Sequence, residues 1–240
     1  MSTRTGRGPH PRDEALFGEK WLSVLREATA DLSWLRTRGY AEPSSVKLVG
    51  DRYRLAARQR IAVARCACSD DALASRRQRR LPLDRLEGLD LFVDGFNVLT
   101  TVEAALAGGV LLRGRDGCVR DMASMHGNYR VLGTTREALE LIRRRLRSAG
   151  PKREIWYLDK PVSNSGRLRE LIEEAARADS ASKTSVRLVK DPDPVLEHTP
   201  AGGVVATADS GILDGCGRWV SLAEEVLAES LPKARIVDLS

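Results

Sequence analysis

The stretch LFVDGFNVL, Leu91 to Leu99, decides how the second part of this chain folds. An apolar run stops at Asp94 and Gly95 and becomes apolar again after Asn97. A short apolar run bounded by turn residues predicts a buried strand, which places Asp94 at its carboxyl end. Because burying an unpaired carboxylate is costly, we expect Asp94 either to cap the end of the strand or to bind a ligand.

Further short apolar runs follow, and amphipathic helices separate them. The runs are IWYLD (155–159), VRLVKD (186–191), VVATAD (204–209) and WVSL (219–222). Strands that alternate with helices predict a parallel sheet with strand–helix–strand connections. Capping boxes at Thr134 and Ser221 predict the starts of two helices, and IVDL near the end predicts an edge strand. The predicted fold class is α/β, a doubly wound parallel sheet preceded by a small all-α basic domain.

The chain before Leu89 has a helical pattern. Helices are expected over 13–39, 44–50 and 55–66, followed by the basic run RRQRR (76–80) and a linker. Short helices joined by a turn that contains glycine are compatible with a helix-turn-helix. We therefore predict two domains, a helical basic domain over 1–88 and an α/β domain over 89–240.

The net charge of +6 lies entirely in the first 90 residues, because acidic and basic residues balance in the remainder. Such an excess favours a polyanionic partner such as RNA, and a solvated basic face is the alternative. RNA binding through this domain predicts a steep dependence on salt concentration. The candidate nucleic-acid contacts are Arg54, Arg58, Arg60, Arg76, Arg77, Arg79 and Arg80.

The cysteines and the termini indicate the compartment. Cys66 and Cys68 are close, but their C-x-C spacing is not a common zinc motif, so reduced, buried thiols are expected for all four cysteines. No apolar stretch approaches the roughly 20 residues of a membrane span, and the first residues do not resemble a signal peptide. We expect a cytoplasmic protein with no membrane partner, and an oligomer is compatible with the sequence.

Three predicted strands end in aspartate, at Asp94, Asp159 and Asp209. Ligands bind in the crevice at the carboxyl edge of a doubly wound sheet, so the three aspartates converge there if the strand 91–94 is central. Clustered carboxylates require a cation or raised pKa values, and an all-oxygen set suits Mg²⁺ or Mn²⁺. Asn97 adds an amide that can orient a water molecule. Glu103 is a further candidate metal ligand, or a surface helix residue.

A long segment between Thr100 and Gly133 is predicted to form a hairpin about 115–117. Arginine can clamp phosphate, tyrosine can stack on a base and histidine can titrate near neutral pH. The alternative is structural, with Arg–Asp pairs that hold the hairpin together. The candidate substrate-binding residues are Arg115, Arg120, Asp121, His126, Tyr129 and Arg130.

Two motifs carry a resemblance to a known group of proteins. FVDGFNVL resembles the first-strand motif of the PIN and NYN nuclease superfamily, and ATADSGIL resembles its late strand. Most of the chain is similar to an uncharacterised family that joins a helical domain of unknown function (DUF434 type) to a PIN-like domain (DUF5616 type). The residues that carry this similarity are LRTRGYAEPSSVKLVGDRYRLAARQR and GRDGCVRDMASMHGNYR.

The superfamily resemblance implies a metal-dependent ribonuclease. It implies Asp94 as the first metal ligand with Asn97 as its neighbour, and Asp209 as the late carboxylate; Asp159 matches the NYN branch less specifically. Gly211 stands where the superfamily often has a further acid, and Asp214 follows as a candidate ligand.

The predicted reaction is hydrolysis of a phosphodiester bond in single-stranded or tRNA-like RNA. A divalent cation, Mg²⁺ or Mn²⁺, would neutralise charge on the phosphoryl oxygens. The expected catalytic residues are Asp94, Asn97, Asp159 and Asp209. The alternatives are a PIN-like module that binds RNA without cleaving it, and a subunit of a ribonucleoprotein or toxin-like system. A dinucleotide-binding dehydrogenase is excluded, because G-F-N-V replaces the glycine-rich turn after the first strand.

Overall fold

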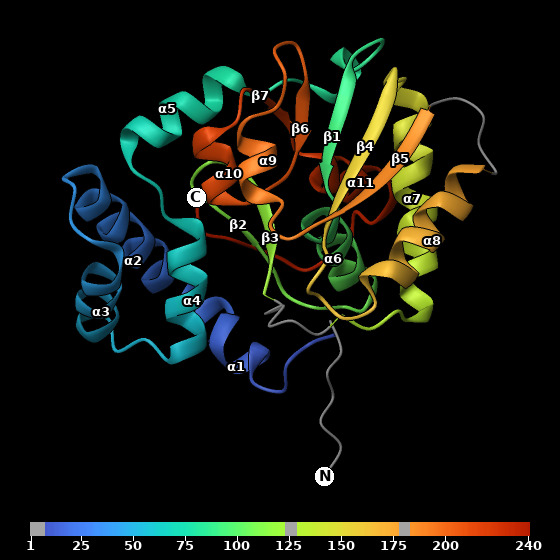
Figure 1. The fold of residues 1–240 in the computed structure, drawn as a ribbon. Coiled ribbons are helices and arrows are strands. Elements are labelled where there is room, and N and C mark those ends of the chain that lie inside the picture. The colour runs from blue at the N-terminus through green and yellow to red at the C-terminus, as the bar shows by residue number, and fades with distance from the viewer. Residues whose placement is uncertain (1–7, 123–128, 178–182) are drawn as a thin grey trace.

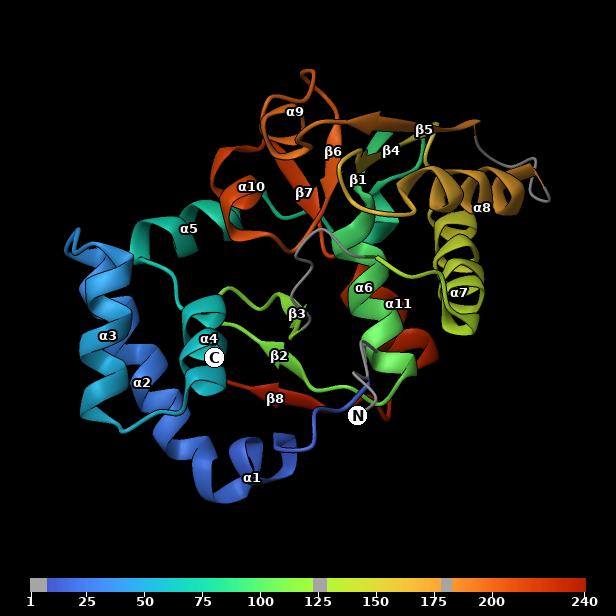
Figure 2. The ribbon, with the colours of Figure 1, turned by 60° about the horizontal axis from the view of Figure 1, so that its bottom comes forward.

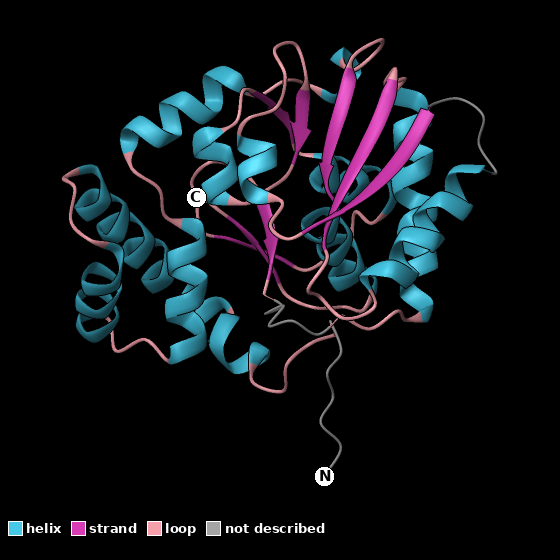
Figure 3. Ribbon diagram, in the orientation of Figure 1, coloured by secondary structure: helices cyan, strands magenta, loops and turns pink. Residues whose placement is uncertain are grey.

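A five-stranded parallel sheet forms the centre of the computed structural model, which describes residues 8–122, 129–177 and 183–240. The strand order is β5-β4-β1-β6-β7, so β1 lies in the middle (Figure 3). Every predicted strand of this sheet forms, and the α/β class is confirmed. The strands are β1 (Asp90–Asp94), β4 (Arg153–Asp159), β5 (Lys183–Val189), β6 (Val204–Ala206) and β7 (Arg218–Val220).

Helices cover both faces of the sheet, because alternate side chains of each strand point to opposite sides. Val93 and Leu158 belong to the core shared with α6 (Gly95–Leu106), α7 (Gly133–Ala149), α8 (Ser165–Arg177) and α11 (Leu222–Ser230). Phe92, Tyr157 and Trp219 belong to a second core shared with α9 (Asp193–Glu197) and α10 (Ser210–Gly215). Figure 1 shows α9 and α10 in front of the sheet.

The N-terminal region is helical, as predicted. Its helices are α1 (Asp13–Phe17), α2 (Glu19–Thr37), α3 (Glu42–Arg52), α4 (Ala57–Cys66) and α5 (Asp70–Arg79), and the short helix η1 (Leu83–Arg85) leads to the sheet. The prediction of one helix over 13–39 was wrong, because the chain is extended at Gly18. A Cβ atom there would lie 2.9 Å from the carbonyl oxygen of Glu14, so the break depends on glycine.

A second, three-stranded sheet joins the two halves of the molecule. It consists of β2 (Leu111–Arg113), β3 (Val119–Asp121) and β8 (Ile236–Asp238), in the order β3-β2-β8. Figure 2 shows it between the N-terminal helices and α6. The predicted hairpin is confirmed, and the C-terminal edge strand pairs with this hairpin. Leu111 faces the core of the main sheet, whereas Leu112 and Val237 pack against the N-terminal helices.

The predicted capping boxes do not form. Thr135, not Thr134, closes the start of α7, by accepting a hydrogen bond of 3.0 Å from the backbone N–H of Leu132. The Ser221 side chain makes no capping bond, and Glu224 pairs instead with arginines of other elements. The cap of α7 is therefore local but lies one residue further along than predicted, whereas at α11 long-range ion pairs replace the predicted local bond.

All four cysteines are buried and free of disulfides, as predicted. Burial raises the pKa of Cys66 and of Cys118 to about 12, so these thiols stay protonated at neutral pH. Within the described ranges, no helix has the length and apolar composition to cross a membrane.

Candidate functional site

A cavity of about 500 Å³ lies between the carboxyl edge of the main sheet and the N-terminal helices. The sheet side carries acidic and amide groups, and the helical side carries two arginines and a glutamate. Lining residues from the sheet side include Asp94, Asn97, Asp193 and Asp209. Those from the helical side include Arg36, Glu42 and Arg65. A polar cleft with opposite charges on its two walls is suited to a ligand that carries both signs of charge or binds with a cation.

Asp94 lies at the junction of β1 and α6 and is only 8% exposed. It caps α6 by accepting a hydrogen bond from the N–H of Asn97 at 3.4 Å, and it accepts another from the Thr207 hydroxyl at 2.8 Å. Asp94 therefore forms a cap, as the structural alternative predicts, although the segment that it caps is the start of α6. Gly95 makes the sharp junction feasible, because a Cβ atom there would lie 2.9 Å from the carbonyl oxygen of Tyr157.

The charge of Asp94 is not compensated by the protein. In the described part of the chain, no basic side chain forms an ion pair with Asp94 or with Asp209. Burial raises the pKa of Asp94 to about 7, and the negative charge of Asp209 adds to the effect, which the Thr207 hydrogen bond opposes. A cap alone needs no such environment, because an exposed aspartate caps a helix equally well. A buried carboxylate of this kind needs a proton or a cation.

Asp209 lies three residues beyond the end of β6, at the start of α10, and is hydrogen-bonded to Thr207 as Asp94 is. Its carboxylate accepts hydrogen bonds from the N–H groups of Gly211 at 2.8 Å and Ile212 at 3.2 Å, and so caps α10. Its own N–H donates to the Thr207 hydroxyl oxygen at 3.0 Å, which links Asp209 to Asp94 through one side chain. The resemblance predicts a further acid at position 211. Gly211 stands there instead, and its backbone N–H donates a hydrogen bond to Asp209.

Asn97 is oriented by the segment that follows β6, the strand next to β1. Its side-chain oxygen accepts a hydrogen bond of 2.8 Å from the N–H of Ala208. The ends of β1 and β6 are thus joined by two side-chain contacts, Asn97 with Ala208 and Asp94 with Thr207. Three of the predicted catalytic residues, Asp94, Asn97 and Asp209, line one cavity.

Asp159 does not line this cavity. It ends β4, and burial raises its pKa, with a further contribution from the charge of Asp191. The negative charge of Asp159 contributes to the raised pKa of Asp193, which does line the cavity. The three predicted aspartates therefore lie along one edge of the sheet, but only Asp94 and Asp209 face the same space.

Asp193 is a cavity residue that the sequence analysis missed. It begins α9 and is exposed at the rim of the cavity. Partial desolvation and the charges of Asp209, Asp191 and Asp159 raise its pKa to about 6. The sequence did contain a signal for this residue. The predicted strand VRLVKD (186–191) also ends in an aspartate, and Asp193 follows two residues later in the stretch DPDP (191–194).

The other two candidate metal ligands lie elsewhere. Glu103 is fully buried and accepts hydrogen bonds from Tyr129 at 3.1 Å and Thr135 at 2.5 Å. Nine residues are two and a half helical turns, so Glu103 lies on the face of α6 opposite to the one that Asp94 begins. Asp214 pairs with Arg76 at 2.8 Å and does not line the main cavity.

Only some of the predicted substrate-binding residues of the hairpin segment line the cavity. Asp121 lines the cavity and accepts hydrogen bonds from the hydroxyls of Thr100 and Thr101. Tyr129 is fully buried, so it has no exposed face on which a base could stack. Arg120 also lines the cavity, but its guanidinium is engaged by Asp116.

Of the remaining hairpin candidates, Arg115 pairs with Asp70 at 2.6 Å. Arg130 is exposed, and His126 lies outside the described residues. The structural alternative for this segment, Arg–Asp pairs that hold the hairpin, is thus realised by Arg120 with Asp116. Arg115 instead ties the hairpin to Asp70 of α5.

Most of the candidate nucleic-acid arginines are engaged within the chain. Arg58 pairs with Asp13, and Arg60 pairs with Asp51. Arg76, Arg79 and Arg80 contact groups of the C-terminal half. Arg54 and Arg77 are exposed. The basic run therefore serves mainly to join the two halves, and much of its charge is neutralised there.

Two family matches cover most of the chain. The family described as "Domain of unknown function (DUF5616)" matches residues 83–225. The chain belongs to this family. A second family, described as "Protein of unknown function (DUF434)", matches residues 24–79. The predicted pairing of the two domains is therefore confirmed.

A relative carries the same similarity along nearly its whole length. The chain is 31% identical over 207 residues to the uncharacterized protein MJ0935 of Methanocaldococcus jannaschii. The similarity covers 86% of this member of the DUF5616 family and 96% of the relative. No solved structure matches the chain.

Magnesium or manganese fits this donor set only as a cation shared with a substrate. Among residues 8–122, 129–177 and 183–240, no group of three or more Asp, Glu, His or Cys side chains is arranged to hold a metal ion. The expectation that three aspartates enclose one ion is therefore corrected. Mg²⁺ is commonly held by one or two carboxylates, with waters and substrate phosphates as the remaining ligands. The uncompensated pair Asp94 and Asp209 is a donor set of that size.

Proposed function

We propose that this protein is a divalent-cation-dependent ribonuclease with a PIN-like fold, which hydrolyses RNA phosphodiester bonds in the cavity at the carboxyl edge of the sheet. The observation that carries the proposal is the buried Asp94, which faces Asp209 with no basic partner among the described residues. The superfamily motif FVDGFNVL supports it, because β1 is central and its Asp94 and Asn97 both line the cavity.

Different residues of the cavity would bind the cation, orient the ligands and accept a proton. Asp94 and Asp209 would hold Mg²⁺ or Mn²⁺, which when bound neutralises charge on the phosphoryl oxygens. The Thr207 hydroxyl orients the Asp94 carboxylate, and the N–H groups of Gly211 and Ile212 orient that of Asp209. The Ala208 N–H orients the Asn97 amide. Asp193, with a pKa of about 6, is suited to accept the proton of an attacking water at neutral pH.

The opposite wall supports a phosphate-containing substrate. Arg36 and Arg65 line the cavity from the helical side, across from the carboxylates. Arg36 donates to the carbonyl oxygen of Ala67 and pairs with Glu42, which uses only part of the five donors of a guanidinium. A phosphodiester held between a cation on one wall and guanidinium groups on the other is bound on both sides.

The test is cleavage of end-labelled single-stranded RNA and of a tRNA-like hairpin, with Mn²⁺ or Mg²⁺ and with EDTA. The parent is expected to cleave only with the cation. Asp94→Asn is expected to abolish cleavage, and Asp193→Asn to slow it by about 100-fold, the usual cost of losing a general base. Asp84→Asn, an exposed aspartate of η1, is the control and is expected to cleave like the parent. Equal cleavage by the parent and Asp94→Asn would refute the assignment.

One observation favours the alternative, a PIN-like module that binds RNA without cleaving it. The described residues lack a three-carboxylate metal group, which removes part of what two-metal chemistry would use. This alternative predicts that the parent and Asp94→Asn bind RNA equally and that neither cleaves it. Affinity should then fall steeply with salt, and a flat response between low and high salt would exclude the basic domain as the RNA contact.

A further inference from the structure

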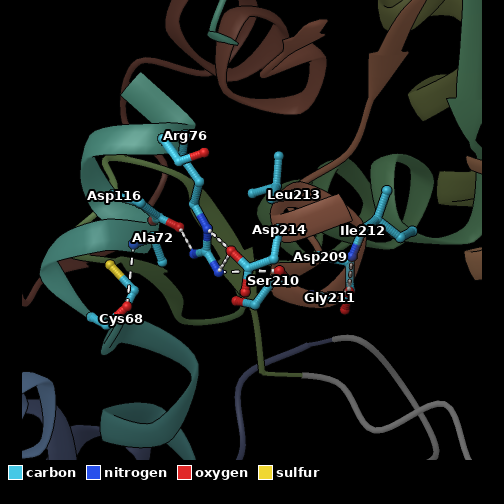
Figure 4. Close-up of polar contacts among 12 residues, drawn as sticks. Cys68, Ala72, Arg76, Asp116, Asp209, Ser210, Gly211, Ile212, Leu213 and Asp214 are labelled. Carbon is cyan, nitrogen blue, oxygen red and sulfur yellow. Dashed lines mark hydrogen bonds and ion pairs between the residues drawn. The ribbon is translucent and has the colours of Figure 1, made fainter. Parts of the chain in front are cut away.

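Helix α5, the last long helix of the N-terminal region, holds the short helix α10 that follows Asp209. Arg76 of α5 is 1% exposed and reaches three groups of the C-terminal half. It contacts Asp116 at 2.5 Å, Asp214 at 2.8 Å and the carbonyl oxygen of Ser210 at 3.1 Å. Figure 4 shows its guanidinium between Asp116 and the residues of α10.

A second arginine of α5 holds the other end of α10. Arg79 donates to the carbonyl oxygen of Leu213 at 2.7 Å and to that of Cys216. An isolated helix of six residues is unstable, because one turn of hydrogen bonds does not repay the cost of nucleation. The position of α10 therefore depends on these contacts, on its packing and on its cap, Asp209.

The same network reaches the peptide on the other side of Asp209. Arg120 binds both oxygens of Asp116, at 2.9 and 2.6 Å, and donates to the carbonyl oxygen of Ala208 at 2.7 Å. Asp116 is thus shared by two arginines, and those arginines bind the carbonyls of Ala208 and Ser210. The backbone is held immediately before and immediately after Asp209.

We propose that Arg76 is a positioning residue for Asp209, so that the N-terminal helical domain is a structural component of the candidate site. The proposal rests on the proposed function. Arg76 does not line the main cavity, and it acts through Asp116, Ser210 and Asp214. It also gives a physical reason for the two matched regions to occur in one chain, since the first supplies an arginine that the second needs.

The test combines Mn²⁺ titration, followed by electron paramagnetic resonance, with amide hydrogen exchange on the full chain. Arg76→Lys keeps the charge but loses the planar fork that binds three groups at once. We expect about tenfold weaker Mn²⁺ binding, a typical cost of losing a residue that supports a ligand. Exchange of the amides of 211–215 should accelerate by at least about tenfold, while those of β1 and β4 keep their rates.

Arg143→Lys is the matched control. Arg143 is equally buried and pairs with Glu154 near the start of β4, away from the carboxyl edge. This variant should leave both Mn²⁺ affinity and exchange of 211–215 unchanged. If Arg76→Lys disturbs the fold as a whole, Asp214→Asn serves instead, because the Asp214 side chain is half exposed and the substitution removes only the charge that pairs with Arg76.

The outcomes separate the two proposals. Parent-like Mn²⁺ affinity in Arg76→Lys overturns the positioning role, even if exchange accelerates. A parent that binds no Mn²⁺ overturns the proposed cation-dependent function, and exchange then decides the positioning role alone. In that case faster exchange confined to 211–215 supports it, and unchanged exchange overturns it.

Discussion

Asp94 and Asp116 are both buried aspartates, 8% and 5% exposed, yet their surroundings differ in charge. Burial would raise the pKa of Asp116, but the hydrogen bonds and charge of Arg120, with the charge of Arg76, outweigh it and hold the pKa at about 2. Asp94 has hydroxyl and backbone partners only, and its pKa is raised to about 7. A compensated buried charge holds a structure together, whereas an uncompensated one is available for a cation or a proton.

The largest effect on stability should come from removing the charge of Asp116, the compensated aspartate. Asp116→Asn leaves the buried Arg120 without its only carboxylate partner among the described residues. We expect the free energy of unfolding to fall by about 3 to 5 kcal/mol, measured by urea denaturation. Asp84→Asn should stay within about 0.5 kcal/mol of the parent. A loss below about 1 kcal/mol would show that Arg76 and Arg120 do not depend on Asp116.

A cation should compensate Asp94 as the arginines compensate Asp116. Mn²⁺ at about 100 times its dissociation constant should stabilise the parent by about 2.7 kcal/mol, through binding to the folded state alone. The urea midpoint at pH 8, with and without Mn²⁺, measures this difference. Asp94→Asn should show a much smaller shift. An equal shift in the two proteins would place the bound cation away from Asp94.

Removing the uncompensated charge should stabilise the cation-free protein. Because the pKa of Asp94 is higher in the folded chain than in the unfolded chain, the folded state keeps a proton that the unfolded state releases. The stability of the parent should therefore fall as pH rises from about 4 to about 7, and stay low above that range. We expect Asp94→Asn to be more stable by about 2 to 4 kcal/mol at pH 8, the upper figure being the full effect of a shift of about three pKa units, and to match the parent at pH 4.

Urea denaturation at several pH values in EDTA measures this difference, with Asp84→Asn as the control. A parent whose stability stays level between pH 4 and pH 7, like that of Asp94→Asn, would mean that Asp94 is not the uncompensated charge inferred here.

The sequence predicted the sheet well because a strand that is buried on both faces appears in the sequence as an unbroken apolar run. The runs around Val93, Trp156 and Val205 are apolar on both faces, as parallel strands covered by helices must be. The meeting of Asp94 with Asp209 followed from one condition, that β1 is central, and the structure meets it.

The misses in the candidate site arose where contacts are long-range. Asp193 enters the cavity because α9 covers the sheet, and no local pattern reports that packing. Glu103 and Tyr129 were expected to be accessible, yet they bind each other in the core. The run RRQRR predicts that Arg76 contacts phosphate, but the charge of Arg76 is neutralised by Asp116, forty residues later in the chain.

The amino-acid sequence by itself determined the alternation of strands and helices, the basic character of the N-terminal helices and the aspartates at the ends of β1 and β6. These follow from periodicity and composition, which act over neighbouring residues. Only the tertiary structure decided which charges are compensated. A carboxylate is stabilised by whichever groups lie within a few ångströms of it, and in this protein the arginines near Asp116 and the hydroxyl near Asp94 come from distant parts of the chain.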